Sequence, residues 1–536
     1  MEAFLHPLQG LAEFEEIKKR CGANCGILNV SGCMESQKVH LMYGLSGLFP
    51  YHLILADDER NAKEIYEDYR FYDKNVYFYP AKDLLFFQAD IHGNLLIRQR
   101  MRVIRALLEQ EEVTVVTSID GCMDFLMPLE KIRSRLLHFK SDSVIDLDQL
   151  KEELVELGYE RTGQVELPGQ FSVRGGIIDI YPLTEDNPWR IELWDDEVDS
   201  IRSFDAESQR SLENVDEITI YPAAEKMDGE DMVSFLEYFP EEKTLVFLDE
   251  LNHLAENGEG VEEEYRQSRM HREEKGEANL PEQWLCGFQE LQKKLNRRNC
   301  VAVSALSPRR SGWKINEEFD LTVKSVDSYN SSFELLVKDL LQYKSQGYRI
   351  ALLSGSRTRA ERLAKDLSEE GLNAFYSQDM DRIISPGEIM VVYGHARRGF
   401  QYPLIKFAVM TETDIFGKEQ KKRKKKKKYS GNRIQDFAEL SIGDLVVHEK
   451  HGLGIYRGIE KVEVDRVVKD YIKIEYRGGS NLYILATQLD ALQKYSGSSE
   501  NAKTPKLNKL GGQEWNKTKS RVKGAVKNIA KELVEL

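Results

Sequence analysis

Short apolar segments alternate with amphipathic ones along two stretches of this 536-residue chain. In the first stretch, residues 51–58 (YHLILADD) and 113–118 (VTVVTS) read as strands, and residues 59–72 (ERNAKEIYEDYRFY) and 98–110 (RQRMRVIRALLEQ) read as helices. Strands that alternate with helices are typical of a parallel sheet covered by helices. The same alternation returns further along the chain, so we predict a multidomain α/β protein.

Residues 135–222 interrupt this pattern, because one short helix is followed by strand and turn signals alone. We expect a separate β-rich domain there, and a small β-barrel near the C-terminus, where glycines separate short strands. We assign residues 1–26 to the first α/β segment (1–134). The alternative is that they pack against the third segment (223–327). The expected segments are 1–134 (α/β), 135–222 (β-rich), 223–327 (α/β), 328–417 (second α/β domain), 418–435 (basic linker), 436–498 (barrel) and 499–536 (linker and helix).

Composition narrows the class of protein. No apolar run reaches the roughly 18–20 residues that span a bilayer, and the N-terminus has no signal-peptide pattern, so we expect a cytoplasmic protein without membrane contact. The net charge of −15 argues against non-specific coating of DNA. Residues 418–428 (KEQKKRKKKKK) are strongly basic, and we interpret them as a solvated linker, with a weak contact to nucleic acid or an acidic partner as the alternative.

Signatures of catalysis and metal binding are weak. The spacing CGANC has no second cysteine pair, and His448 and His451 lie in a strand-turn segment, so no metal site is expected. No segment matches the phosphate-binding pattern GxxxxGK[ST]. The nearest candidate, MYGLSGLFPYHLIL, lacks the lysine. We therefore predict no catalytic residue and no cofactor in this chain.

Two further segments resemble parts of nucleotide-dependent motors. Asp249 and Glu250 end an apolar strand, as the acidic pair of an ATPase does, and Arg397 and Arg398 follow a strand where helicases place phosphate-sensing arginines. Without a phosphate cradle these residues have no nucleotide to act on. We interpret them as structural vestiges.

One face of the β-rich domain is a candidate binding surface. In the strand WRIELW, alternation places Ile191 and Leu193 on one face and Arg190 and Trp194 on the other. We interpret QFSVRGGIIDIYPL (170–183) as one strand with a bulge at its two glycines, which brings Arg174 to that second face. Arginine and tryptophan dominate interface hot spots, so we predict a protein-binding surface. The alternative is that the tryptophan packs against the guanidinium groups.

The predicted barrel offers a second surface. Residues 466–485 (RVVKDYIKIEYRGGSNLYIL) read as two strands joined by a Gly-Gly turn, with Ile472 and Ile474 on one face and Lys473 on the other. A basic, aliphatic edge strand can add to the sheet of another protein. In the tail, the apolar residues Val522, Val526, Ile529, Leu533 and Leu536 share one helical face, so we expect a helix that leads into a further segment.

A series of motifs resembles the N-terminal part of the bacterial transcription-repair coupling factors, the Mfd family. These motifs are ELPGQFSVRGGIIDIYP, IELWDDEVDSIRSFDAESQRS, TETDIFGKE, DLVVHEKHGLGIYRGIEKVEV and KLGGQEWNKTKSRVKGAVKNIAKEL. The resemblance covers essentially the whole chain. It implies a UvrB-like α/β domain without a working P-loop and with an inserted α+β domain, a further α/β domain, and a CarD/Tudor-like barrel followed by a helix.

The resemblance also implies partners. The family binds RNA polymerase stalled at a lesion, recruits UvrA, and displaces the polymerase with an ATP-driven motor on double-stranded DNA. By motif match, Arg174, Arg190 and Trp194 contact UvrA. Ile472, Lys473 and Ile474 contact the polymerase β subunit by the same criterion. The motor, with its ATP and magnesium and most of the DNA contact, is expected after Leu536, so this chain is not expected to hydrolyse ATP.

Two alternatives stay open from the sequence. One is a UvrB-like, ATP-dependent damage-recognition helicase of nucleotide excision repair, which the missing GK[ST] disfavours. The other is a CarD-like transcription regulator, which the roughly 430 residues ahead of the barrel disfavour.

Overall fold

The computed structural model describes residues 1–22, 25–82, 93–224, 232–274, 285–308, 312–416, 432–433, 440, 442–448, 451–464, 467–485, 492–495, 506–509 and 515. The chain divides into two compact units, residues 1–265 with 281–420, and residues 266–280 with 421–536. The predicted basic block and tail helix lie outside the described residues. No helix among those residues combines the length and apolar character needed to cross a bilayer.

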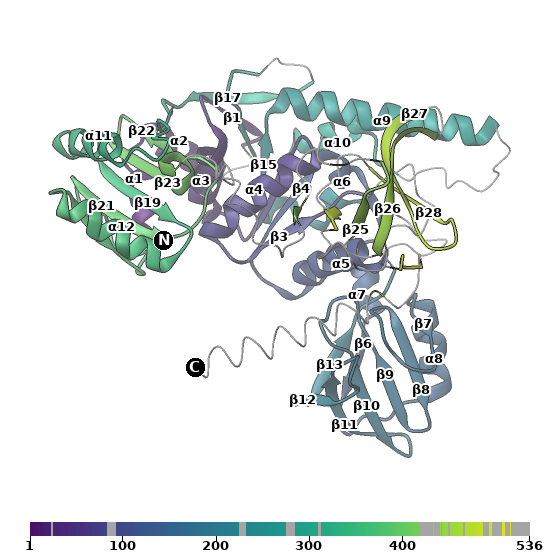
Figure 1. Cartoon of the computed structure of the whole chain (residues 1–536). Coiled ribbons are helices and arrows are strands. Elements are labelled where there is room, and N and C mark those ends of the chain that lie inside the picture. The colour runs from purple at the N-terminus through teal and green to yellow at the C-terminus, as the bar shows by residue number, and fades with distance from the viewer. Residues whose placement is uncertain are drawn as a thin grey trace, which may run out of the picture. The chain divides into compact units, whose positions relative to one another are not determined.

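A seven-stranded sheet forms the centre of the first unit, in the order β17-β1-β16-β15-β2-β4-β3 (Figure 1). Every neighbouring pair in it is parallel. Segments far apart in the chain meet in this sheet, since Thr244 pairs with Tyr51. Its strands are β1 (Ile27–Ser31), β2 (Tyr51–Ala56), β3 (Val76–Tyr79), β4 (Val113–Ser118), β15 (Thr244–Asp249), β16 (Cys300–Val303) and β17 (Ile315–Asp320). The predicted mixed α/β architecture is confirmed.

Helices cover both faces of this sheet, as the continuous burial of its central strands requires. One apolar core includes side chains of α3 and α4, and the other includes side chains of α5, α9 and α10. The helix predicted over residues 59–72 is confirmed, and Asp58 caps it by accepting a hydrogen bond from the Asn61 amide at 2.6 Å. The helices are α1 (Glu2–Leu8), α2 (Ala12–Cys21), α3 (Glu35–Ser46), α4 (Glu59–Tyr72), α5 (Gly93–Glu109), α6 (Ile119–Met123), α7 (Leu129–Ser134), α9 (Leu251–Glu274) and α10 (Phe288–Leu295), with short 3₁₀ turns at Phe235–Tyr238 and Glu241–Lys243.

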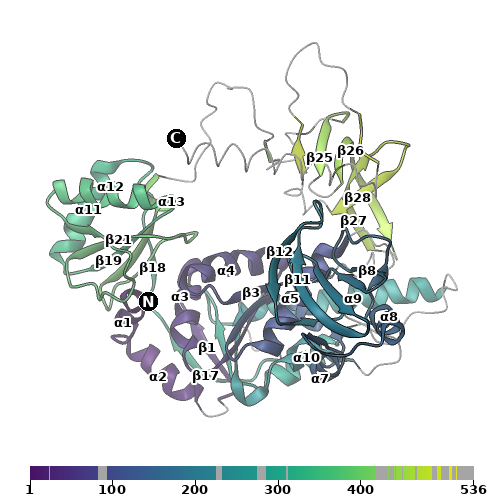
Figure 2. The same ribbon diagram turned by 90° about the horizontal axis from the view of Figure 1, so that it is seen from below.

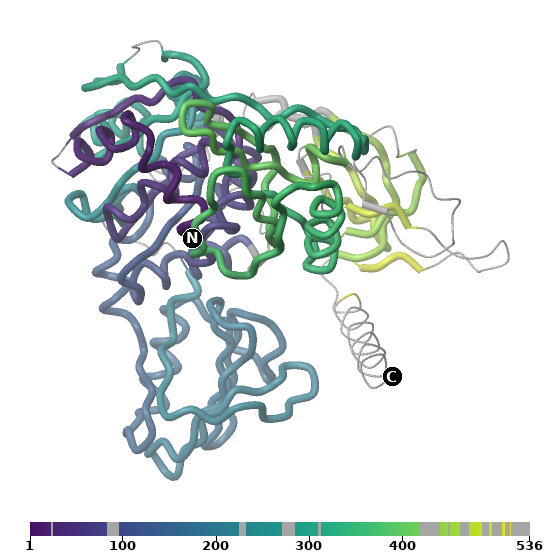
Figure 3. Tube along the Cα trace, turned by 90° about the vertical axis from the view of Figure 1, so that its left-hand side faces the viewer, coloured from purple at the N-terminus to yellow at the C-terminus, as the bar shows by residue number. Residues whose placement is uncertain are grey.

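Residues between the two halves of that sheet form a second sheet, drawn in blue in Figure 3. Its order is β12-β11-β10-β9-β8-β7, and its pairs are antiparallel except β7–β8. The helix α8 packs its apolar side against one face of this sheet. The elements are β6 (Leu137–Lys140), α8 (Leu147–Glu156), β7 (Glu160–Arg161), β8 (Gln170–Arg174), β9 (Ile177–Ile180), β10 (Trp189–Trp194), β11 (Glu197–Phe204), β12 (Ser211–Val215) and β13 (Glu217–Ile220), and the short strands β5 (Phe125–Leu126) and β14 (Val233–Ser234) pair with each other nearby.

The last part of the first unit is another α/β layer, with strand order β18-β22-β23-β19-β21-β20. The helices α11 and α12 pack on one face of the sheet (Figure 2), and the other face joins the core that contains α1 and α3. The elements are β18 (Lys324–Ser325), α11 (Phe333–Ser345), β19 (Arg349–Ser354), α12 (Arg357–Glu369), β20 (Asn373–Tyr376), β21 (Glu388–Tyr393), β22 (Phe400–Tyr402), β23 (Phe407–Thr411) and α13 (Glu412–Phe416).

The second unit contains a six-stranded antiparallel sheet in the order β24-β29-β25-β26-β27-β28. The predicted pair of strands with a Gly-Gly turn is confirmed as β27 and β28. The strands are β24 (Asn432–Arg433), β25 (Leu445–His448), β26 (Gly452–Val464), β27 (Val467–Glu475), β28 (Asn481–Leu485) and β29 (Leu492–Lys494).

Candidate interaction surfaces and a nucleotide-like loop

The segment QFSVRGGIIDIY is a β-hairpin. Arg174, at the end of β8, pairs with Ile177, at the start of β9, and the two glycines are the turn between them. Gly175 has a φ of +61°, the conformation that a two-residue hairpin turn demands of its first residue. The predicted single strand with a bulge is therefore wrong. The sheet does contain register shifts, but they lie in the pairing of β10 with β11, after Glu192, and in that of β11 with β12, after Arg202.

The hairpin still presents Arg174 on the expected face. Val173 pairs with Ile178, whose side chain is in the core, and alternation sends the next side chain to the opposite face. Arg190 is directly opposite Asp179 in the pairing of β10 with β9, so these two side chains share that same face. The prediction that the two arginines share a face is confirmed by this register.

A buried carboxylate joins the two arginines. Asp179 has a side chain that is 1% exposed, and it accepts hydrogen bonds from Arg174 Nη2 at 2.6 Å, Arg190 Nε at 2.7 Å and Arg190 Nη2 at 2.9 Å. Those hydrogen bonds raise the pKa of Arg190 above its ordinary value. Sequence reasoning missed Asp179, although an acid between Ile178 and Ile180 in a half-buried strand signals a paired polar group.

Trp194 stands at the end of β10 with 80% of its surface exposed. So large an exposure excludes the alternative in which the indole is buried against the guanidinium groups. The aromatic ring that stacks on Arg190 belongs instead to Phe204, whose centroid is 4.3 Å from the guanidinium carbon. The face therefore combines an organised arginine pair with an uncovered aromatic side chain, the residue types that dominate protein interfaces.

The strand β27 of the second unit is an interior strand. It lies between β26 and β28, and both Ile472 and Ile474 are fully buried. The predicted edge-strand position is therefore wrong, and neither isoleucine offers its side chain to a partner. Lys473 is partly exposed and donates to Glu460 at 2.8 Å, which raises the pKa of the lysine.

A loop between β1 and the first turns of α3, residues 32–39, resembles the phosphate-binding loop of nucleotide-binding proteins. We call it the nucleotide-like loop. The sequence GCMESQKV (32–39) keeps the first glycine and the lysine of GxxxxGK[ST], and it has glutamine and valine where glycine and serine or threonine are required. It also has the strand–loop–helix context of such a loop. Sequence reasoning missed it because the full pattern was required. A search that kept only Gly32 and Lys38 would have found it.

Three backbone amides at the start of this loop have partners inside the protein. The amide of Gly32 donates to the Ala305 carbonyl at 3.3 Å, and that of Cys33 donates to the Ser304 carbonyl at 3.1 Å. The amide of Met34 donates to the side chain of Gln37 at 3.0 Å. The glutamine that replaces the second glycine thus occupies the cradle itself.

The lysine of the loop is held by the acidic pair of β15. Lys38 Nζ donates to Asp249 at 2.7 Å and to Glu250 at 2.6 Å, and Asn61 also donates to Asp249 at 2.7 Å. Burial lowers the pKa of the lysine, but the two carboxylates outweigh it and raise the pKa overall, so the ammonium stays charged. The residues that would contact phosphates and magnesium in an ATPase here neutralise one another.

The two arginines at the helicase-like position, interpreted from the sequence as vestiges, also make contacts within the protein. Arg397 donates from its amide and from Nε to the two oxygens of Asp68, both at 3.0 Å, and it forms an ion pair with Glu64. The amide of Arg398 donates to Ser36 Oγ at 3.1 Å, within the nucleotide-like loop. These contacts join the second α/β layer to α4 and to the loop.

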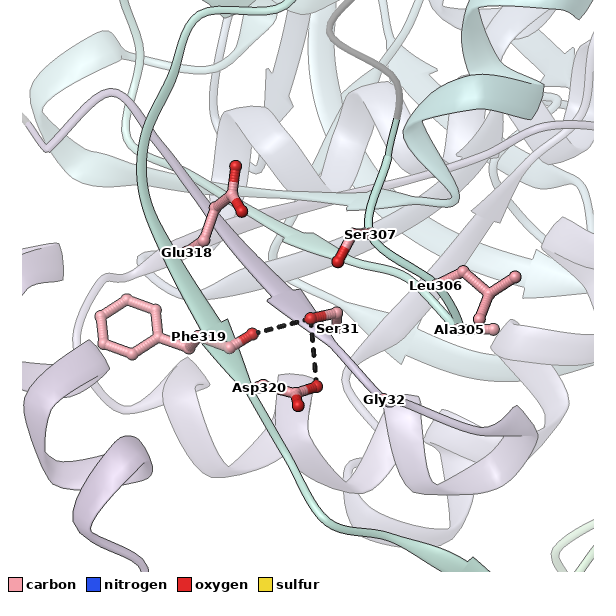
Figure 4. Close-up of a pocket in the computed structure, with 8 residues that line it drawn as sticks. All are labelled: Ser31, Gly32, Ala305, Leu306, Ser307, Glu318, Phe319 and Asp320. Carbon is pink, nitrogen blue, oxygen red and sulfur yellow. Dashed lines mark hydrogen bonds between the residues drawn. The ribbon is translucent and has the colours of Figure 1, made fainter.

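A pocket of about 310 Å³ opens beside the loop, at the carboxyl ends of β1, β16 and β17 (Figure 4). Ser31 Oγ donates to the Phe319 carbonyl at 3.1 Å and to Asp320 Oδ1 at 3.2 Å. Glu318 and Asp320 both line the pocket, so its charge disfavours a phosphate. Among the described residues, no cluster of three His, Cys, Asp or Glu side chains could hold a metal ion.

Comparison with known proteins identifies two domains and a set of relatives. Residues 137–225 match the UvrB interaction domain, and residues 440–496 match the CarD-like/TRCF RID domain. The chain is 30% identical to the transcription-repair-coupling factor of Bacillus subtilis (strain 168), over 95% of this chain and 49% of that protein. It is 29% identical to that of Staphylococcus aureus (strain USA300), over 86% of this chain and 44% of that protein.

These matches confirm the resemblance to transcription-repair coupling factors. The two predicted binding surfaces lie within the two matched domains, since Arg174, Arg190 and Trp194 fall in 137–225 and Lys473 falls in 440–496. The chain spans about half the length of the curated relatives it matches.

Proposed function

We propose that this chain is the part of a transcription-repair-coupling factor that connects RNA polymerase to the excision-repair protein UvrA. The observation that carries this proposal is the presence of the two matched domains in one chain that aligns with such factors over most of its length. A protein that holds both partners at once recruits repair to the place where transcription has stopped.

The UvrA-binding surface is the face of the β-rich domain that carries Arg174, Arg190 and Trp194. Two arginines on one buried acid leave a net positive charge, and the exposed indole beside them supplies apolar area. This combination suits a partner that presents a carboxylate next to an apolar side chain. The edge of this surface is the glycine turn of the β8–β9 hairpin, which adds no side chain that would cover it.

The polymerase-binding surface belongs to the CarD-like domain. Ile472 and Ile474 support it from the core, and Lys473 is the one of the three predicted contacts that reaches the surface. The strand β28 ends the strand order of this sheet within the described residues. No further strand pairs with its outer edge within the part of the chain that the structure describes, which suits the addition of a strand from the polymerase β subunit, so we assign to β28 the strand addition expected for β27.

The rival function is an ATP-dependent damage-recognition helicase. Against it stand three amides of the nucleotide-like loop that already donate within the protein, and the ion pairs of Lys38 with Asp249 and Glu250. We assign ATP, magnesium and translocation on double-stranded DNA to a motor outside these 536 residues, as the family resemblance implies. A cytoplasmic location is part of the same proposal.

Equilibrium binding to purified UvrA and to purified RNA polymerase tests the proposal. We expect Arg174→Glu to weaken binding to UvrA at least tenfold and to leave binding to polymerase unchanged, because the reversed charge repels a carboxylate. Lys473→Glu should show the opposite pattern. An unchanged chain that binds neither protein, or that hydrolyses ATP at the rate of a helicase, would refute the proposal.

A further inference from the structure

Asp179 is nearly inaccessible to solvent, yet both arginines of the UvrA-binding surface contact it. Its side chain is 1% exposed, whereas that of Arg190 is 14% and that of Arg174 is 44% exposed. A buried carboxylate without a cation is strongly destabilising, so the acid and the two arginines form one unit. The exposed fraction of the side chain rises from Asp179 through Arg190 to Arg174. Within this ionic cluster, Arg190 is therefore the inner arginine and Arg174 the outer one.

Arg190 is the inner arginine. Its Nε and Nη2 make a two-pronged contact with Asp179, and Nη2 also donates to Gln209 at 3.1 Å. Its guanidinium lies over the ring of Phe204. The side of the guanidinium that matches a carboxylate best is therefore already engaged inside the domain.

Arg174 is the outer arginine. Within the described part of the chain its guanidinium makes one hydrogen bond, from Nη2 to Asp179 at 2.6 Å. That bond fixes the orientation of the planar group, and the side chain is 44% exposed, so the remaining donors are available to a partner. The contact restricts a long side chain before a partner arrives, which lowers the entropy lost on binding.

We propose that Asp179 is a positioning residue that orients Arg174 as the carboxylate-binding contact, and that Arg190 supports this arrangement from inside the domain. This inference rests on the proposed function of the same surface. Two positive charges and one negative charge leave one unit of positive charge, which a single carboxylate of the partner neutralises. The partner residue is thus an aspartate or glutamate, with an apolar neighbour that packs on Trp194.

A double-mutant cycle on UvrA binding tests the positioning role. Asp179→Asn and Arg174→Ala should each weaken binding about tenfold, and the double variant should bind like Arg174→Ala alone, because the acid acts through that arginine. The matched control is Asp148→Asn, which removes an exposed acid of α8, the helix that packs on the opposite face of the sheet, and should change binding less than twofold. Losses that multiply in the double variant would overturn the proposal.

Lysine substitutions test the two arginine roles without touching the buried acid. Arg174→Lys keeps the charge and loses the planar fork, so it should weaken binding to UvrA at least fivefold at an unchanged melting temperature. Arg190→Lys should lower the melting temperature as well. An Arg174→Lys variant that binds UvrA as tightly as the unchanged chain would overturn the assignment of Arg174 as the carboxylate-binding contact. If the unchanged chain itself fails to bind UvrA, the proposed function falls, whereas binding with the wrong pattern overturns the positioning role alone.

Discussion

His40 is a neutral histidine in the apolar core between α1, α3 and β22. Its Nε2 donates to the Phe4 carbonyl at 2.9 Å, and its Nδ1 accepts from the Tyr402 hydroxyl at 3.1 Å. Burial lowers the pKa of His40 to about 4, and the contact with the Phe4 carbonyl opposes this shift only in part. The unfolded chain has a histidine pKa of about 6.5, so unfolding takes up a proton in mildly acidic solution.

This difference predicts a loss of stability in acid. Above about pH 6.5 His40 is neutral in both states and has no effect on the pH dependence. As the pH falls from about 6.5 to about 4, the free energy of unfolding should decrease by up to about 1.4 kcal/mol per pH unit. Urea midpoints at pH 7 and pH 5, compared with those of His40→Gln, measure the effect. The same pH dependence in both proteins would contradict it.

Lys38 allows a second test at the residue scale. Lys38→Met removes the cation from two carboxylates at a buried site, so we expect the free energy of unfolding to fall by about 3–5 kcal/mol. The matched control is Lys63→Met, which breaks an exposed pair with Glu59 and should cost about 1 kcal/mol or less. Equal urea midpoints for the two variants would show that the nucleotide-like loop does not depend on this ion pair.

Single residues differ in how far the sequence predicts them. Alternation along one strand was enough to place Arg190 and Trp194 on one face, because the period of a strand is fixed by its geometry. The partner of Arg190 was not predictable in the same way, since Asp179 is on another strand and meets it only through the register. Lys38 was missed for a different reason: its loop has lost the residues that define the motif while it keeps the position.

At the scale of elements, the structure corrects the predicted position of β27 from the edge of its sheet to the interior. Whether a strand lies at the edge or in the centre of a sheet depends on its neighbours, and β27 pairs with both β26 and β28. The alternation of Ile472 and Ile474 with Lys473 was read correctly, but the pattern of an edge strand with one buried face is the same as that of an inner strand with one buried face. The sequence of one strand therefore could not decide the matter.

This placement predicts different outcomes for neighbouring substitutions in β27. Ile472→Arg puts a charge into the core of the second unit, so it should abolish the melting transition of that unit together with polymerase binding. Lys473→Glu changes a partly exposed side chain and should leave the transition within a few degrees of that of the unchanged chain. Circular dichroism during heating measures both. A folded Ile472→Arg variant that has lost polymerase binding alone would restore the direct contact first assigned to Ile472.

The β8–β9 hairpin shows a related limit. The two glycines correctly marked a departure from a plain strand, and both a bulge and a two-residue turn use glycine for its freedom in φ. Only the pairing of Arg174 with Ile177 distinguishes the two. The predicted face of Arg174 is nevertheless correct. A two-residue turn, like a bulge, lets Ile178 point into the same core as Val173, so Arg174 points to the opposite face.

At the scale of the whole molecule, the alternation of strands and helices predicted the α/β class but not the order of the strands. Strands on either side of the β-rich domain pair within one parallel sheet, which brings Lys38, from the start of the chain, to Asp249. Contacts of this kind join residues that are 211 positions apart, and no local pattern encodes them. The comparison with known proteins contributes what neither pattern nor geometry provides, the identity of the two matched domains.

The central claim is that one chain holds RNA polymerase and UvrA at the same time through separate surfaces. The most direct measurement is retention of UvrA on immobilised RNA polymerase in the presence of this chain. We expect UvrA to be retained only when the chain is added, and to be lost with Arg174→Glu while that variant itself stays on the polymerase. Retention of UvrA by Arg174→Glu at the level of the unchanged chain, or no retention with the unchanged chain, would contradict the claim.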